Sequence, residues 1–142
     1  MEKEVFLFSS GRWKGEGEII IAPFPESISF RVEWEVICRE ESIQATQVVK
    51  MSDVKEAVVS YFTIYDIREG SFSLLLDSSY SGRVEGRGGH QEGVISWEFT
   101  GLSSFVGFER YEREAGGGYR FQAQYGPSDD FHTSIEGMIA RL

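Results

Sequence analysis

Cysteine, positive charge and long apolar runs are all scarce in this chain, and each scarcity excludes a class of protein. The single cysteine, Cys38, excludes a disulfide framework and a zinc site built from several cysteines. With 14 basic against 23 acidic residues the net charge is −9, so a phosphate backbone would be repelled. Apolar runs such as 19–22 fall far short of the roughly 20 residues of a membrane helix, and the start lacks a secretory signal. We therefore expect a cytoplasmic protein with neither nucleic acid nor membrane as partner.

Apolar and aromatic residues, by contrast, are plentiful, at 41 % and 14 % of the chain. That fraction is enough to bury a core, which excludes intrinsic disorder despite the charge. A length of 142 residues fits a single domain, because domains cluster around roughly 100–150 residues. We therefore expect residues 1–142 to form one domain.

The clearest periodicity is two. Between Ser27 and Cys38 the even positions are all apolar or cysteine: Ile28, Phe30, Val32, Trp34, Val36 and Cys38. The odd positions carry serine, arginine and glutamate, interrupted only by Ile37. This alternation is typical of a half-buried strand, since a helix would not place those side chains on one face.

Similar segments recur along the whole chain and are rich in the β-branched and aromatic residues that suit a pleated surface. Turn-forming connectors separate them, at 68–70, 86–93, 115–118 and 126–130. Such short links cannot cross between parallel strands, so neighbours should pair antiparallel. Only Ser52–Glu56 could form a helical turn. The predicted strands run over 13–22, 27–38, 43–51, 57–67, 72–76, 80–86, 94–100, 105–113, 119–125 and 131–141.

This pattern predicts an all-β fold, either a sandwich or a closed barrel. A sandwich usually has longer connections where the chain changes sheet. Nearly every connector here is the size of a hairpin turn, and closure removes exposed edges. We therefore predict a single antiparallel up-and-down β-barrel of about ten strands.

The opening Gly11-Arg12-Trp13 resembles the Gly-x-Trp motif of the calycin superfamily, which includes lipocalins, fatty-acid-binding proteins and nitrobindin-like barrels. The segments 94–99 and 109–111 are similar to small bacterial lipocalin-like families of unknown function. The resemblance implies that Trp13 covers the barrel floor beneath an arginine from a late strand, either Arg141 or Arg120. Only residues 23–26 separate the first two predicted strands, which leaves no room for a helical lid and favours a nitrobindin-like open barrel.

Polar side chains that share a predicted face with apolar ones are the candidate ligand-binding residues. Such faces, if they point inward, give an apolar cavity with a few polar groups, the usual composition of a small-molecule site. Arg110, grouped with Val106 and Phe108, could bind a ligand carboxylate, but it could equally pair with an internal glutamate or lie outside. Trp97 could form a wall or simply pack in the core. The full candidate set is Arg110, Tyr61, Thr63, Tyr65, Trp97 and Thr133.

No residue pattern indicates catalysis or a metal site. Nitrobindin-like proteins hold haem through a histidine near the end of the barrel, so the resemblance implies His132 as a possible haem ligand. Alternation argues against it, because Phe131 and Ile135 share one face and His132 falls on the other. We expect His90 to be a turn residue, since the glycine-rich segment 86–93 is typical of a hairpin loop.

These features leave three candidate functions. The first is a barrel that holds a hydrophobic or amphipathic small molecule. The second is a haem-binding nitrobindin-like protein, with gas sensing or isomerase chemistry. The third is a barrel filled by its own aromatic side chains that binds a protein partner. A homodimer is compatible with all three.

Overall fold

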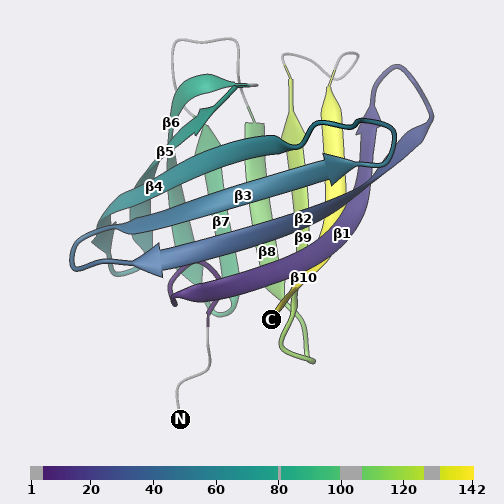
Figure 1. Ribbon diagram of the computed structural model, residues 1–142. Helices are drawn as coiled ribbons and strands as arrows, with labels where there is room; N and C mark the ends of the chain where they lie inside the picture. The colour runs from purple at the N-terminus through teal and green to yellow at the C-terminus, as the bar shows by residue number, and fades with distance from the viewer. Residues whose placement is uncertain (1–4, 80, 100–106, 127–131) are drawn as a thin grey trace.

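Ten antiparallel strands close into a barrel in the computed structural model, which describes residues 5–79, 81–99, 107–126 and 132–142 (Figure 1). Each strand pairs with its neighbours in the sequence, and β1 pairs with β10 to complete the barrel. The strands are β1 (Gly11–Ile21), β2 (Ser27–Cys38), β3 (Ile43–Met51), β4 (Val58–Arg68), β5 (Ser71–Ser78), β6 (Gly82–Gln91), β7 (Val94–Phe99), β8 (Gly107–Arg113), β9 (Tyr119–Tyr125) and β10 (Thr133–Arg141).

The predicted up-and-down barrel is confirmed, and the sandwich is excluded by the closed strand order. The bounds of β2, β3 and β9 are those that alternation predicts. Residues 52–56 form a turn and a bend instead of the helical turn considered from the sequence. Among the described residues no helix is long and apolar enough to span a membrane.

The two ends of the barrel differ. At the end where β1 begins and β10 finishes, residues 5–10 turn inward and place Phe6 and Leu7 inside, at 0 % and 1 % exposure. The Phe6 ring lies 5.4 Å from Trp13, 5.1 Å from Trp34 and 4.7 Å from Tyr111, measured between ring centroids. Its backbone N–H donates to the Tyr119 hydroxyl at 3.3 Å. We call this the plugged end, and the opposite end, where β1 connects to β2, the mouth.

An aromatic layer fills the middle of the barrel. The rings of Trp97 and Tyr111 stack at 5.3 Å, and those of Tyr111 and Phe121 also stack at 5.3 Å. Phe62 contacts both Trp34, at 5.1 Å, and Trp97, at 5.9 Å. All five side chains are at most 5 % exposed, so burial and ring packing here stabilise the fold from every side of the barrel.

The glycine-rich segment 86–93 is not a hairpin loop, and that prediction was wrong. Residues 86–91 lie within β6, and only Glu92 and Gly93, both with positive φ, form the turn. A Cβ on Gly88 would lie 2.4 Å from the Phe72 ring. The inward glycines therefore leave space for large side chains on the neighbouring strand. In the sequence, glycines with this packing role look the same as the glycines of a turn.

The plug offers a direct test of how much the aromatic interior contributes to stability. Phe6→Ala should lower the free energy of unfolding by about 3–5 kcal/mol, because it removes a fully buried ring and leaves a cavity. The matched variant Phe24→Ala, at a position 67 % exposed, should change it by less than about 0.5 kcal/mol. Urea unfolding followed by tryptophan fluorescence measures both, and equal losses in the two variants would contradict the plug.

Candidate functional site

The described core contains one charged side chain, that of Glu109 on β8, which is 5 % exposed. In the strand register Glu109 lies opposite Trp97 on β7 and Ala123 on β9, both of which face the interior. A buried carboxyl group in a barrel lined by aromatic rings needs hydrogen bonds to offset its lost hydration. Its partners therefore define the chemistry of the site.

Two phenols meet the Glu109 carboxylate. The Tyr111 hydroxyl donates to Oε1 at 3.0 Å, and the Tyr125 hydroxyl donates to Oε2 through a short hydrogen bond. The Trp97 indole N–H lies close enough to favour the charged carboxylate, yet it has no hydrogen-bond partner in the described structure. Glu109 thus receives one donor on each oxygen.

Burial dominates the ionisation of this cluster. It raises the pKa of Glu109 above the ordinary value of 4.5, although the hydrogen bonds from Tyr125 and Tyr111 act in the opposite direction. Burial and the neighbouring carboxylate also raise the pKa values of Tyr111 and Tyr125 well above 10.0. Both phenols therefore remain protonated donors at physiological pH.

The cluster lies beneath the mouth. Tyr125 is only partly buried, and its ring occupies the space beside Gly107, where a Cβ would come within 2.5 Å of it. Thr133 on β10 is directly opposite Tyr125 in the register and is also partly buried. Around them four apolar side chains, those of Ile28, Val49, Met51 and Ile135, are only partly buried, whereas Phe99 at the end of β7 is buried. We call the following set the mouth site: Glu109, Tyr125, Thr133, Ile28, Val49, Met51 and Ile135.

Two of the sequence-predicted ligand residues face the interior. Trp97 is 2 % exposed and packs in the aromatic layer beside Glu109. Thr133 has the inward parity of Ile135 and Ile139 and lies at the mouth. Their contact with a ligand stays a prediction.

The expected inward direction of Tyr61, Thr63 and Tyr65 was wrong. On β4 the opposite face is buried, with Ser60, Phe62 and Ile64 in the core, whereas Tyr61 is 58 % exposed. Both faces of this strand are rich in apolar or aromatic residues, so alternation alone assigns the wrong one. The register with β3, where Tyr61 lies opposite Thr46 and Phe62 opposite Ala45, determines the direction.

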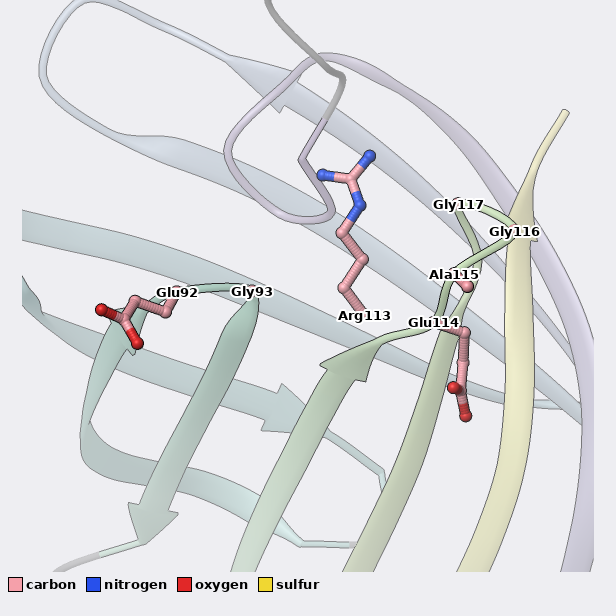
Figure 2. A pocket seen from close by; sticks show the side chains of 7 residues that line it. All are labelled: Glu92, Gly93, Arg113, Glu114, Ala115, Gly116 and Gly117. Atoms are coloured by element: carbon pink, nitrogen blue, oxygen red, sulfur yellow. The ribbon is translucent and has the colours of Figure 1, made fainter.

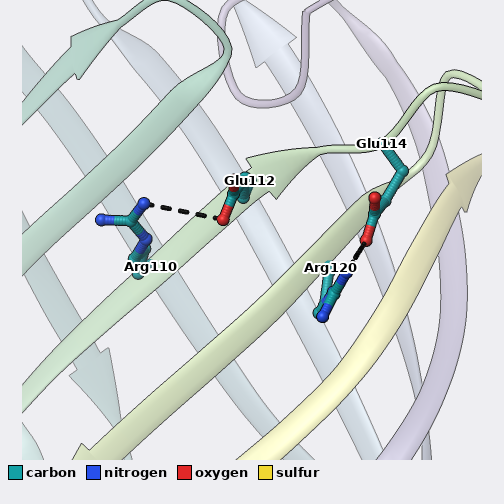
Figure 3. A network of polar contacts seen from close by, with 4 residues as sticks. All are labelled: Arg110, Glu112, Glu114 and Arg120. Carbon is teal, nitrogen blue, oxygen red and sulfur yellow. Dashed lines mark hydrogen bonds and ion pairs between the residues drawn. The ribbon is translucent and has the colours of Figure 1, made fainter.

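Arg110 also lies outside the barrel, which was one of the alternatives left open. Its guanidinium contacts Glu112 at 3.6 Å on the outer face of β8, and Arg120 on β9 forms a similar surface pair with Glu114 (Figure 3). The inward alternative is excluded, because Phe108, which shares the face of Arg110, is itself 40 % exposed. Val106, the third member of that predicted face, lies outside the described residues.

The predicted structural pair of Trp13 and Arg141 is adjacent in space. Trp13 is 1 % exposed and lies opposite Arg141 in the pairing of β1 with β10. The Arg141 guanidinium donates to the Ser10 carbonyl at 3.2 Å, which ties the last strand to the plug segment. Arg120, the alternative partner, is engaged with Glu114 on the surface.

The described residues do not fit a haem site. His132 comes one position before the inward Thr133, and aromatic side chains occupy the middle of the barrel. His90 is a strand residue and not the expected turn residue, and its ring packs 4.6 Å from Phe8 at the plugged end. No group of three or more possible metal ligands occurs in the described segments.

Two surface hollows occur at the plugged end, away from Glu109. The larger, of about 700 Å³, lies between the β6–β7 and β8–β9 turns, where Arg113 extends between Glu92 and Glu114 (Figure 2). The smaller, of about 390 Å³, is lined by residues that include His90, Glu92 and Arg110. Both are open and carry acidic and basic groups side by side, so neither favours a particular ligand charge.

Sequence reasoning missed Glu109 and Tyr125. On β8 attention went to the face of Arg110, and Glu109 on the other face was not considered, while Tyr125 was the last residue of a predicted strand with no partner in view. The available signal was weak: Glu109 and Tyr111 share parity, as do Tyr119, Phe121, Ala123 and Tyr125 on β9. Only the β8–β9 register joins these two rows.

Comparison with known proteins supports the fold. No protein-family model matches the chain, and no curated protein matches it in sequence. Rv2717c from M. tuberculosis superposes with a TM-score of 0.69 at 13 % identity, covering 94 % of this chain and 92 % of its own. The S-type phycobiliprotein lyase CPES from Guillardia theta gives 0.67 at 11 % identity over 94 % and 88 %. EF1p2_mFAP2b bound to DFHBI gives 0.52 at 10 % identity over 94 % and 93 %. The chain therefore shares the fold of these proteins, which in this chain is a closed ten-stranded antiparallel barrel.

The raised pKa of Glu109 predicts a specific pH dependence of stability. In the folded chain Glu109 keeps its proton at pH values at which Glu109 of the unfolded chain has released it. The stabilisation that results is fully present below pH 4.5 and is lost as the pH rises through the folded-state pKa of Glu109. Glu109→Gln removes the titration. Urea unfolding from about pH 4.5 to neutrality should show wild type losing more stability than the variant, and parallel curves would contradict the burial of an ionisable Glu109.

Proposed function

We propose that the chain binds a hydrophobic or amphipathic small molecule at the mouth site. The observation that carries this proposal is the asymmetry of the barrel: Phe6 and Leu7 fill one end, while the apolar residues of the mouth site, at the other end, are only partly buried around a buried carboxyl group. An apolar surround with a few convergent polar groups is the usual composition of a small-molecule site. The cytoplasmic location expected from the sequence stays a prediction.

The aromatic layer sets the depth of this site. Since Trp34, Phe62 and Trp97 fill the middle of the barrel, a ligand would occupy the half nearer the mouth and would not run the length of the interior. Trp97 and Glu109 would form its floor, with Tyr125 and Thr133 on one wall. The neighbour bound to DFHBI supports the idea that a barrel of this fold can hold a small molecule, without indicating which compound this chain prefers.

Two adjacent valines on β3 provide a matched test. Val49 faces the interior opposite Val32, whereas Val48 faces outward opposite Glu33. Val49→Trp should fill the mouth and weaken binding of the uncharged fluorescent probe N-phenylnaphthylamine at least about tenfold, while Val48→Trp should leave it unchanged.

Native mass spectrometry of freshly purified wild type should show a bound adduct that Val49→Trp lacks. If wild type shows no adduct and does not bind the probe, the proposal is contradicted. An equal loss of probe affinity in Val48→Trp would place binding elsewhere.

A second function, partner binding, is favoured by the outer face of β4. Val59, Tyr61, Thr63 and Tyr65 form a row there, with Leu75 of β5 beside Thr63, and we call this set the outer stripe. Exposed aromatic rows of this kind often mark protein interfaces. We propose a second copy of the chain as the occupant, because the neighbouring outer face of β6 alternates Arg83, Glu85 and Arg87. A two-fold related copy could place opposite charges together along that edge.

Sedimentation velocity tests the homodimer. Wild type should dimerise reversibly by about 0.1 mM, and Tyr61→Ser with Tyr65→Ser should shift it to monomer because two aromatic contacts are lost. Ile20→Ser, at a position 40 % exposed on β1, should leave the dimer intact. A wild type that stays monomeric at this concentration would rule out the stripe as a self-association surface.

A further inference from the structure

Glu109 imposes a requirement on whatever occupies the mouth site, because its buried carboxylate has no cationic partner among the described residues. The ion pairs found in the described part of the chain lie at the surface and none includes Glu109. Two phenols supply hydrogen bonds but no positive charge. A buried ionised carboxylate without a counter-charge is unfavourable, so a ligand that brings one gains more than a neutral ligand does.

The cluster also has unused capacity to accept hydrogen bonds. A carboxylate has about four lone-pair positions, and Tyr111 and Tyr125 fill one on each oxygen. Since both hydroxyl hydrogens are already donated, the phenol oxygens can act only as further acceptors. The floor of the mouth site is therefore rich in acceptors, and the Trp97 N–H is the one donor beside them among the described residues.

We propose that the mouth site selects an apolar molecule whose head group is a protonated nitrogen, such as an amine or amidine, which donates hydrogen bonds to Glu109. This inference rests on the proposed function and names its ligand class. An ammonium head cancels the buried charge, a hydroxyl head supplies one donor without charge, and a carboxylate head is repelled. The order of preference is amine, alcohol, then acid, the reverse of what an inward Arg110 would have given.

The chain as a whole acts in the same direction. Its net charge of −9 raises the local concentration of cations and lowers that of anions. Tyr125 lies two residues nearer the mouth than Ala123, the partner of Glu109 in the register, so an incoming head group meets the Tyr125 side chain first and then donates to the lone-pair positions that the two phenols leave open on the carboxylate. Thr133, opposite Tyr125, adds a hydroxyl acceptor at the rim.

Three probes with the same tail, decylamine, decanol and decanoate, test the selectivity by displacing N-phenylnaphthylamine from the full chain near neutral pH. Wild type should bind the amine at least about tenfold more tightly than the acid. Glu109→Gln should abolish most of this difference. Glu112→Gln removes the same charge from the outer face of the same strand, where Glu112 pairs with Arg110, and should retain it.

A measurement on wild type alone covers the case in which Glu109→Gln does not fold. Among the residues that the structure describes, the titratable groups that face Glu109 are Tyr111 on β8 and Tyr125 on β9, which stay protonated, while β7 presents Trp97 and Phe99. Lowering the pH through the raised pKa of Glu109 should therefore remove the preference for decylamine over decanol. Decylamine remains charged throughout, so the change reports the protein.

The outcomes separate the two proposals. If none of the three probes binds, the proposed function fails. If they bind with equal affinity, or decanoate binds best, the site is a general apolar one and the selectivity is overturned. If the preference for the amine persists in Glu109→Gln, or falls equally in Glu109→Gln and Glu112→Gln, the preference comes from the overall charge of the chain. Either result overturns the role of Glu109.

Discussion

Pairing of β1 with β10 is the interaction on which the rest of the structure depends, because it turns a row of hairpins into a closed surface. The seam runs from Trp13 opposite Arg141 to Ile21 opposite Thr133. Gly17 and Gly137 face each other within it, and a Cβ on either would collide with backbone and approach the ring of Phe30 or Phe121. The seam is thus narrow on its inner side, which lets large rings from neighbouring strands pack across it.

Closure also divides the interior into two chemical regions. Towards the plugged end, rings contact rings and Phe6 fills the remaining space, so burial of apolar area dominates. Towards the mouth, a carboxylate and two phenols share the same wall with aliphatic side chains. The first region accounts for stability, and the second is where the barrel gives up some stability by burying an ionisable group. Buried titratable groups with shifted pKa values cluster at functional sites.

The sequence predicts the barrel far better than it predicts the site. Strand β2 alternates between apolar and charged residues, so its bounds and its buried face both follow from the pattern. Strands β4 and β8 carry aromatic residues on their outer faces, as Tyr61 and Phe108 show, and there the pattern is ambiguous. A shift of one residue exchanges the two faces, so the pattern alone leaves open whether Arg110 or Glu109 points inward. Register with the adjacent strands resolves the ambiguity, and register is a property of the assembled sheet.

The plug formed by Phe6 and Leu7 has a consequence for exchange. In a barrel that is open at both ends, an incoming molecule could enter at one end while the bound molecule leaves at the other. Because the plug closes one end, a bound compound and its replacement would use the same opening. The first compound would therefore have to dissociate before the second could bind. The exchange rate of a bound compound would then be set by its dissociation rate and would not increase with the concentration of the replacing compound.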